Sequence, residues 1–403
     1  MGLPRLRPLD IFPVQTDDGV VFHIRDHERI QENELVVHPV VYAIAAFLDG
    51  ERDAAGVLAA LRRNFKNVAV SLEEIEKVVD ELDRHHLLQS PAFEAKRATL
   101  EEEYLTRPAR PPTLFQRSAG GTLAKMLDGF FTAEGGPGSA PSAGRGTRLK
   151  GVISPHIDYF RGGATYAHAY KAIAEGTDAD LFVILGVAHV SPPVPYVLGD
   201  RGYETPFGEM PCDAGFVKRL CGRVRRDPRE HRFAERTEHS IELQAVYLRH
   251  ILGKRRASIV PILCCSFEAM ADGRSPCETE AIEEFVVALR DTLADEEKKV
   301  CVISGADLAH VGPRFGDPDP VSPSLISWME AEDRVSLERV AAGDAEGFYR
   351  SVMADGNKRK VCGLSSIYTF LRVVEGPGTL LRYGYAPDPA GGMVSFASVA
   401  FGG

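Results

Sequence analysis

Residues 151–163 read GVISPHIDYFRGG, and this stretch decides the fold of most of the chain. Its opening run is short and apolar, which is typical of a strand buried on both faces of a sheet. The run ends at Pro155 and His156, and a pair of glycines follows. Residues 181–190, LFVILGVAHV, repeat the pattern, with His189 just after the apolar run. The sequence therefore predicts two buried strands, each with a histidine at its carboxyl end.

Outward from these two runs, the chain alternates between short apolar runs and helical stretches. Further strands are predicted at 257–264, 299–307, 379–387 and 393–402, and helices at 163–176, 240–252, 277–298 and 324–344. This alternation predicts an α/β fold: a three-layer α/β/α domain over residues 118–403 with a parallel or mixed sheet. Sites in such folds form at the carboxyl ends of strands, which is where the two histidines fall.

Residues 1–95 predict a separate, small α+β domain. A hairpin over 12–26 turns at Asp18 and Gly19, and three helical patterns follow. Ser71 opens the third helix with Glu74 three residues on, which is a capping box. These elements indicate a winged-helix-like fold. Their order, and the acidic helix followed by HHLL, resemble PqqD-like domains, which are small peptide-recognition modules; a plain accessory or dimerisation domain is the alternative.

Two segments have the composition of connections. Residues 96–117 are charged and then rich in proline and arginine, which indicates a linker between the two domains. Residues 134–146 are rich in glycine, proline and serine and indicate a loop.

The composition argues against several classes of protein. A net charge of −10 disfavours binding to a nucleic acid, and the acidic run over 73–83 would repel phosphate. No apolar run approaches the roughly 18 residues that span a membrane, and the N-terminus lacks the apolar core of a signal peptide. The seven cysteines are odd in number and form no Cys-x-x-Cys pair, so a disulfide framework is not expected. The expected location is a reducing cytoplasm.

Three side chains are candidate metal ligands: His156, His189 and Cys362. Imidazoles at two equivalent strand ends are well placed to hold one ion. Cys362 lies in RKVCG (359–363), just before an apolar helical stretch. A helix N-terminus and two neighbouring cations favour the thiolate, which is the form that binds metals. The alternative for Cys362 is a small buried hydrophobe, which is the better interpretation of Cys301.

Four further side chains are candidates for catalysis: His310, Asp307, His239 and Glu242. Asp307 and His310 both follow a buried strand, in GADLAHVG, and fit either metal ligands or an orienting carboxylate and a general base. His239 and Glu242 lie three residues apart on one face of a predicted helix. The alternative for this pair is a solvated helix start with a capping role.

Five motifs occur in order: VISPHIDYFRGG, VILGVAHV, TEHSIELQ, VISGADLAH and RKVCG. Together they resemble the Memo family, also known as AmmeMemoRadiSam system protein B, whose fold is similar to that of class III extradiol (LigB-type) dioxygenases with non-haem Fe(II). The resemblance implies that His156, His189 and Cys362 are the metal ligands. It places Asp307 and His310 in the pocket as its carboxylate and histidine.

In the same family pattern, His239 and Glu242 belong to a motif near that pocket. One departure is Asp158, which stands where the family has a small residue and is expected to add a charge near the metal.

The resemblance implies a metal-dependent protein, and three functions are compatible with its site. The first is a dioxygenase-like oxidoreductase with Fe(II), in which His310 moves a proton and Asp307 orients it; zinc or copper are the alternative metals. The second is a non-catalytic partner of a radical-SAM enzyme and an AMMECR1-like protein, with the N-terminal module presenting a peptide. The third is a zinc hydrolase with a metal-bound water. The substrate, a small molecule or a peptide, stays unassigned.

Overall fold

The structure is a computed structural model that describes residues 2–65, 69–142, 146 and 148–402. The chain divides into two compact units. The smaller comprises Met1–Arg107 with Pro313–Gly316, and the larger comprises Pro108–Gly312 with Asp317–Gly403.

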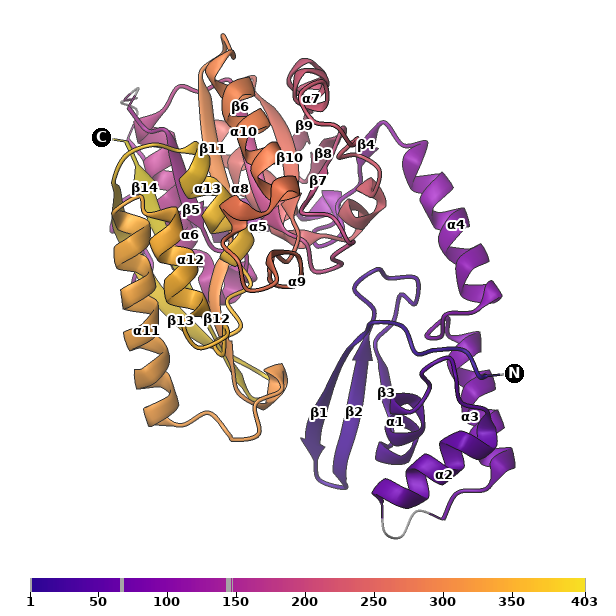
Figure 1. Cartoon of the computed structure of the whole chain (residues 1–403). Helices are drawn as coiled ribbons and strands as arrows, with labels where there is room; N and C mark the ends of the chain where they lie inside the picture. Colours follow the sequence, from indigo (N-terminus) through magenta and orange to yellow (C-terminus); the bar gives the residue numbers. More distant parts are fainter. Residues whose placement is uncertain (1, 66–68, 143–145, 147, 403) are drawn as a thin grey trace. The chain divides into compact units, whose positions relative to one another are not determined.

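The larger unit is built on a mixed sheet of eight strands, in the order β12–β14–β5–β11–β6–β10–β7, with β13 paired to β14 (Figure 1). The four central strands β5, β11, β6 and β10 are parallel, and the flanking ones are antiparallel. The strands are β5 Gly151–Ser154, β6 Leu181–Val187, β7 Tyr196–Leu198, β10 Ser258–Cys264, β11 Val300–Gly305, β12 Asp307–Val311, β13 Gly378–Asp388 and β14 Gly392–Phe401.

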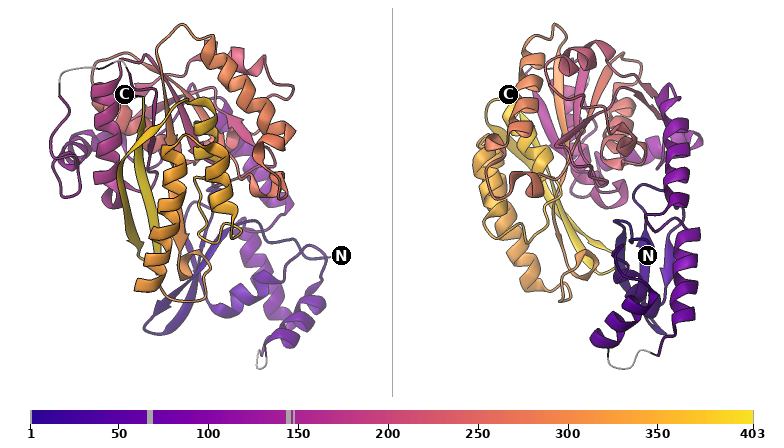
Figure 2. Two further views of the ribbon diagram at one scale, coloured as in Figure 1. Left: turned by 60° about the vertical axis from the view of Figure 1, so that its left-hand side comes forward. Right: turned by 45° about the vertical axis from the view of Figure 1, so that its right-hand side comes forward.

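Helices cover both faces of this sheet (Figures 1 and 2). One face carries α5 Gly120–Phe130, α6 Tyr159–Gly176 and α8 His239–Leu252. The other carries α7 Ala214–Cys221, α9 Glu268–Ala271, α10 Glu280–Ala294, α11 Pro323–Ala341, α12 Ala345–Met353 and α13 Leu364–Val373.

Side chains of β6 alternate between the two faces of the sheet. Val183 and Leu185 pack into the core beneath α10, α12 and α13, and Phe182 and Ile184 pack into the core beneath α6 and α8. Every residue of β6 is buried. The predicted three-layer α/β/α architecture is therefore confirmed.

Two features of the larger unit differ from the sequence prediction. The strand predicted over 299–307 ends at Gly305, and Asp307–Val311 forms β12, which pairs antiparallel with β14. Asp307 and His310 thus lie within a strand, not in a loop after one. A short second sheet, β4 Ala109–Arg110, β8 Gly202–Thr205 and β9 Gly208–Met210, was not predicted, because runs of two to four residues carry no visible periodicity.

In its described residues, the smaller unit has a three-stranded antiparallel sheet and four helices. Its elements are β1 Asp10–Thr16, β2 Gly19–Arg25, β3 Leu35–Val37, α1 Pro39–Ala46, α2 Ala54–Asn64, α3 Leu72–Arg84 and α4 Pro91–Leu105. The predicted hairpin is present, with Thr16 paired to Gly19 and the glycine at a φ of 119°. The predicted capping box between Ser71 and Glu74 is also present.

The first part of the predicted linker is helical. Helix α4 extends to Leu105, because Ser90 caps it, Pro91 occupies its first position and strong helix formers follow. Of the predicted loop at 134–146, residues 143–145 lie outside the described residues, and the rest forms turns and bends. No helix of the described part is both long and apolar enough to cross a membrane.

Candidate metal centre

Three parallel strands place the predicted site residues at one edge of the sheet. β5 and β6 lie on either side of β11, so His156, Asp307 and His189 all follow carboxyl ends at the same edge. His239, the first residue of α8, joins them: ligand atoms of His156, His189 and His239 all lie within 4.8 Å of one another. The rings of His189 and His239 stack with centroids 4.5 Å apart. Three imidazoles so arranged form a candidate metal site.

His156 is held by main-chain groups and one carboxylate. Its ring is buried, and its Nδ1 lies 3.0 Å from the carbonyl oxygen of Gly305. Because a carbonyl only accepts, Nδ1 carries the proton and Nε2 is left with the lone pair that a metal requires. The main-chain N–H of His156 donates to Asp307 Oδ1 at 2.9 Å. The ring orientation is therefore set before any metal binds.

His189 is held by Glu238, the residue before α8. Its Nδ1 lies 3.0 Å from both carboxylate oxygens of Glu238, and its main-chain N–H donates to Oε2 at 2.9 Å. Burial alone would raise the pKa of Glu238, but the charge and hydrogen bonds of His189 hold that pKa well below its usual range. An ionised carboxylate on Nδ1 directs Nε2 to the site and raises its basicity as a ligand.

Two glycines allow the first turn of α8 to approach the sheet closely. A Cβ on Gly186 would lie 2.5 Å from Ser240 Oγ, and one on Gly305 would lie 2.8 Å from the carbonyl oxygen of Ser240. The Ser240 hydroxyl accepts from the main-chain N–H of Val187 at 3.0 Å and donates to its carbonyl at 3.1 Å. This contact brings His239 next to the loop that carries His189.

Cys362 lies beside His156. Its Sγ is 3.4 Å from His156 Nε2 and 3.8 Å from the carbonyl oxygen of Asp307. Asp307 Oδ2 is itself 3.7 Å from His156 Nε2. The structure thus gathers a thiol, a carboxylate and three imidazoles, although the group that meets the ligand spacing contains His239 and not Cys362.

The predicted reason for a thiolate at Cys362 is wrong. The two neighbouring cations pair elsewhere: Arg359 with Asp333 and Lys360 with Asp317. Burial, and after it the negative charge of Asp307, raise the pKa of the Cys362 thiol well above its usual range. A thiolate here requires the charge of a bound cation, since metal binding displaces the proton.

His310 lies in β12 and is partly buried. Its Nδ1 is 3.1 Å from the carbonyl of Leu308, so Nδ1 donates and Nε2 accepts. Burial lowers the pKa of His310 to about 4; the charge of Asp307 opposes this shift, and those of His156 and His189 add to it. At neutral pH the ring is therefore an uncharged proton acceptor, as the prediction of a general base requires.

The carboxylate of Glu242, which the sequence predicts as a catalytic group, is held by a buried arginine and by main-chain N–H groups. Its carboxylate accepts from Arg110 Nη1 at 2.8 Å and from the main-chain N–H groups of Thr113 and Leu114 at 2.8 and 2.9 Å. All of its surface is buried. The spacing of His239 and Glu242 on α8 could not reveal these contacts, because the partners of Glu242 lie in the segment predicted as a linker.

Arg110 is a residue that the sequence analysis missed. Its guanidinium is fully buried and donates to the carbonyl oxygens of Glu235, at 2.8 Å, and Glu238, at 2.6 Å, besides Glu242. It therefore fixes the main chain of the segment that carries Glu238 and His239. A lone arginine in a proline-rich stretch gave no signal of such burial, because Arg is almost never buried unless it is paired.

Asp158, which the sequence predicts to add a charge near the metal, lies at the N-terminus of α6. Its side chain caps α6, accepting from the main-chain N–H of Arg161 at 3.2 Å and from Arg161 Nε at 2.6 Å. Its charge is thus used at the helix N-terminus.

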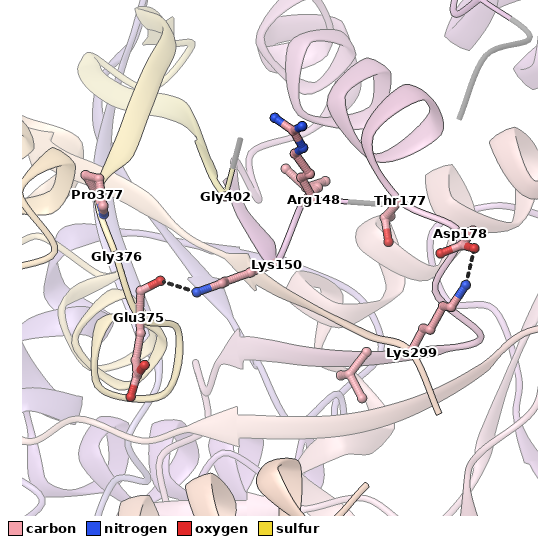
Figure 3. Close-up of a pocket in the computed structure, with 11 residues that line it drawn as sticks. Arg148, Lys150, Thr177, Asp178, Lys299, Glu375, Gly376, Pro377 and Gly402 are labelled. Atoms are coloured by element: carbon pink, nitrogen blue, oxygen red, sulfur yellow. Dashed lines mark hydrogen bonds and ion pairs between the residues drawn. The ribbon is translucent and has the colours of Figure 1, made fainter. Parts of the chain in front are cut away.

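The amino-terminal edge of the same sheet has a different character. A hollow of about 690 Å³ lies there, and Figure 3 shows the cations around it. Lys150 Nζ donates to the carbonyl of Glu375 at 3.1 Å, and Lys299 pairs with Asp178. These two lysines are already paired within the protein. At the carboxyl edge, by contrast, the ligand atoms of His156, His189 and His239 lie within 4.8 Å of one another.

Residues 110–400 match the family model described as Memo-like protein. The chain belongs to this family. A MEMO1 family protein of Aquifex aeolicus (strain VF5) is 25% identical over 403 residues, which is 99% of this chain and 99% of the relative. One of Methanopyrus kandleri is 27% identical over 291 residues, covering 69% of this chain and 93% of the relative. The Memo-like match falls in the larger unit, and the Aquifex relative spans the smaller unit as well.

Proposed function

We propose that this Memo-like protein is a metal-dependent oxidoreductase of the dioxygenase-like type, with Fe(II) held by His156, His189 and Cys362. The observation that carries the proposal is the convergence of prearranged donors. The Nδ1 of His156 is bound by Gly305 and the Nδ1 of His189 by Glu238. In each ring the Nε2 atom is therefore left to bind a metal. Such outer contacts are the usual companions of metal-binding imidazoles.

The position of Cys362 supports its part in the ligand set. Metal–nitrogen and metal–sulfur bonds of about 2.1 and 2.3 Å would separate the two donors by about 3.1 Å at a right angle and about 3.6 Å at a tetrahedral angle. The 3.4 Å between Cys362 Sγ and His156 Nε2 lies between these two separations. His239, whose ring stacks on that of His189, would then be an additional imidazole beside the ion and available to a substrate.

The donor set suits iron. Two imidazoles and one anionic ligand leave coordination positions open on one side, as in the facial triad of Fe(II) oxygenases. When bound, the ion would supply electron transfer between O₂ and a bound substrate. Asp307 holds the main chain of His156, and His310 Nε2 is the base that accepts a proton from the substrate. The substrate is a small molecule or a peptide.

The test is elemental analysis of protein purified anaerobically without chelator. Wild type is expected to hold near-stoichiometric iron, and Cys362→Ser is expected to lose it. Cys221→Ser is the matched control, because Cys221 is a partly buried thiol on α7 whose Sγ lies near Asp227. His239→Gln is expected to keep the metal and lose activity in an O₂-consumption screen.

Iron retained in Cys362→Ser but lost in His239→Gln would overturn the ligand assignment and give the third position to His239. Zinc alone in wild type would move the function to a hydrolase with a metal-bound water. Wild type without any metal would overturn the proposal as a whole.

A second candidate function concerns the smaller unit, which we propose presents a peptide to the metal domain or to partner enzymes of the radical-SAM and AMMECR1-like types. β3 is an edge strand of its sheet, and Val36 is 58% exposed there. A hollow of about 570 Å³ lies between β3 and α3, with Val41 and Val78 in its lining. An edge strand beside an apolar hollow fits an extended peptide, whose main chain would pair with β3.

The test is selection from a displayed peptide library on the full chain. Selected peptides are expected to bind wild type and Val335→Lys, and to bind Val36→Lys at least tenfold more weakly. Val335 is the matched control because it is a 46% exposed valine on α11 of the larger unit. Equal binding to both variants would remove β3 as the recognition surface.

A further inference from the structure

The hollow between β3 and α3 of the smaller unit has one wall formed by a strand edge. Among the described residues β3 pairs only with β2, so its outer main-chain groups are open to another strand. Leu35 and Val37 pack against the core of the unit, whereas Val36 between them is 58% exposed. Because strand side chains alternate, a segment paired with β3 would direct every second side chain toward the hollow. The half-buried Val41 and Val78 in its lining suit apolar side chains there.

The other wall of the hollow is an acidic helix. α3 carries six acidic side chains against two basic ones, in the run LEEIEKVVDELDR. Both basic side chains line the hollow and are bound to acids of the same helix: Lys77 lies 2.6 Å from Glu73, and Arg84 contacts Glu81. The remaining acidic side chains have no cation of α3 to neutralise them, so the potential over this wall is negative.

Asp80 is the acidic group of this wall that has no partner. It lines the hollow and is exposed, and among the described residues its carboxylate makes no hydrogen bond or ion pair. Glu81, the other acid in the lining, is bound by Arg84 and by His85, the latter at 3.1 Å. The carboxylate of Asp80 therefore attracts a cationic side chain of a ligand and repels an anionic one.

The charge of α3 also selects between occupants of the hollow. A second copy of this chain that paired through its own β3 would bring Glu32 and Glu34, which precede that strand, beside the acidic helix. Like charges disfavour this arrangement, and they disfavour an acidic peptide for the same reason. A segment with basic side chains is stabilised by the same potential.

We propose, on the basis of the peptide-presenting function above, that the hollow binds an extended peptide in which lysine or arginine flanks apolar residues at alternate positions. The main chain of the peptide pairs with β3, and its apolar side chains lie against Val41 and Val78. A cationic side chain of the peptide reaches Asp80.

The test compares the peptides selected by three forms of the full chain: wild type, Asp80→Lys and Glu76→Lys. A displayed library of random peptides is selected on each form in about 50 mM salt, where charges are weakly screened, and is then sequenced. On wild type, lysine and arginine are expected to rise about twofold or more over the unselected library. The same rise is expected on Glu76→Lys and no rise on Asp80→Lys.

Glu76→Lys is the matched control, because Glu76 is an exposed acid of the same helix that does not line the hollow. Both substitutions place a good helix former at an exposed position, so both variants should fold normally.

A second measurement isolates the charge of the peptide. One selected peptide and its version with glutamine in place of each lysine and arginine are titrated against wild type by fluorescence anisotropy. The basic peptide is expected to bind about threefold more tightly, as for one exposed ion pair, and the ratio should approach one in about 0.5 M salt.

The outcomes separate this proposal from the function on which it rests. Selection of no peptide by wild type would remove the peptide-presenting function and this proposal with it. Peptides that bind wild type but not Val36→Lys, without enrichment in lysine or arginine, would overturn only the basic chemistry of the peptide. Equal enrichment on wild type and on Asp80→Lys would overturn the part assigned to Asp80.

Discussion

His156 and His189 leave strands on either side of β11, but the protein holds them by different means. The Nδ1 of His156 meets the main-chain carbonyl of Gly305, whereas that of His189 meets the side chain of Glu238. No substitution removes a main-chain carbonyl, so the first contact belongs to the fold itself. The second depends on a carboxylate, and through it on the start of α8. The difference predicts that the His189 side of the site is the one that mutations can disturb.

The largest effect is expected from Arg110, which holds the start of α8. Arg110→Met would leave the buried carboxylate of Glu242 without its cation, at a cost of about 3–5 kcal/mol in the free energy of unfolding. The matched variant on the His156 side is Arg161→Met, which removes part-buried ion pairs with Asp158, whose carboxylate is 45% exposed, and with Asp388. Such a pair contributes under about 1 kcal/mol.

Urea unfolding followed by the fluorescence of Trp328, the only tryptophan, reports on the larger unit. Equal decreases in the free energy of unfolding of Arg110→Met and Arg161→Met would contradict the asymmetry between the His189 and His156 sides of the site.

The second effect is a pH dependence on the α8 side. Burial raises the pKa of Glu235 from 4.5 to about 7, opposed by the Tyr203 hydroxyl and Arg110; nearby Asp200 raises it and Arg201 lowers it. Between pH 4.5 and 7 the folded state keeps this proton and the unfolded state releases it. The free energy of unfolding should therefore fall as pH rises through that window, by at most about 3 kcal/mol.

Glu235→Gln cannot titrate, so its unfolding free energy should change less with pH over this window than that of wild type. The two profiles are compared by urea titrations at matched pH values. Parallel profiles would show that Glu235 ionises normally.

The third effect compares the metal affinity of variants at Glu238, which contacts His189, and at Asp307, which contacts His156. Glu238→Gln removes the negative charge on His189 Nδ1 and should weaken metal binding by about 10–100-fold. Asp307→Asn keeps an oxygen that accepts from the main-chain N–H of His156, and the ring of His156 is held by Gly305. The loss of metal affinity in Asp307→Asn should therefore be smaller than in Glu238→Gln. Competition with a chelator of known affinity measures both. A greater loss in Asp307→Asn would reverse the comparison.

The sequence predicted features that depend on local patterns, but not the side-chain pairs that form between distant parts of the chain. Strand periodicity predicted the three layers, and the polar residues after each buried strand predicted the edge at which His156 and His189 meet. Chain neighbours did not predict side-chain pairing: Arg359 and Lys360 flank Cys362 but bind Asp333 and Asp317. Long-range pairing leaves no local pattern.

Glu242 illustrates the same limit from within a motif. His239 and Glu242 lie three residues apart on α8, yet one reaches the histidine cluster and the other binds Arg110, 132 residues earlier in the chain. Glu238 and Gln244 of the same motif also contact the histidine loops, Glu238 at His189 and Gln244 at the carbonyl of Pro155. Each residue of the motif has a different partner, which spacing alone could not assign.

The smallest effect is expected at Asp158, where this chain departs from the family pattern. Asp158→Ala removes the cap of α6 and should cost about 1 kcal/mol in urea unfolding, whereas Asp158→Asn keeps the hydrogen bond and should cost less. Neither should change metal affinity, because the carboxylate is bound to Arg161. A tenfold change in metal affinity in Asp158→Asn would show that the charge acts on the ion, and the His156 side would then also depend on a side chain. An unchanged affinity would leave the main chain as the principal support of His156.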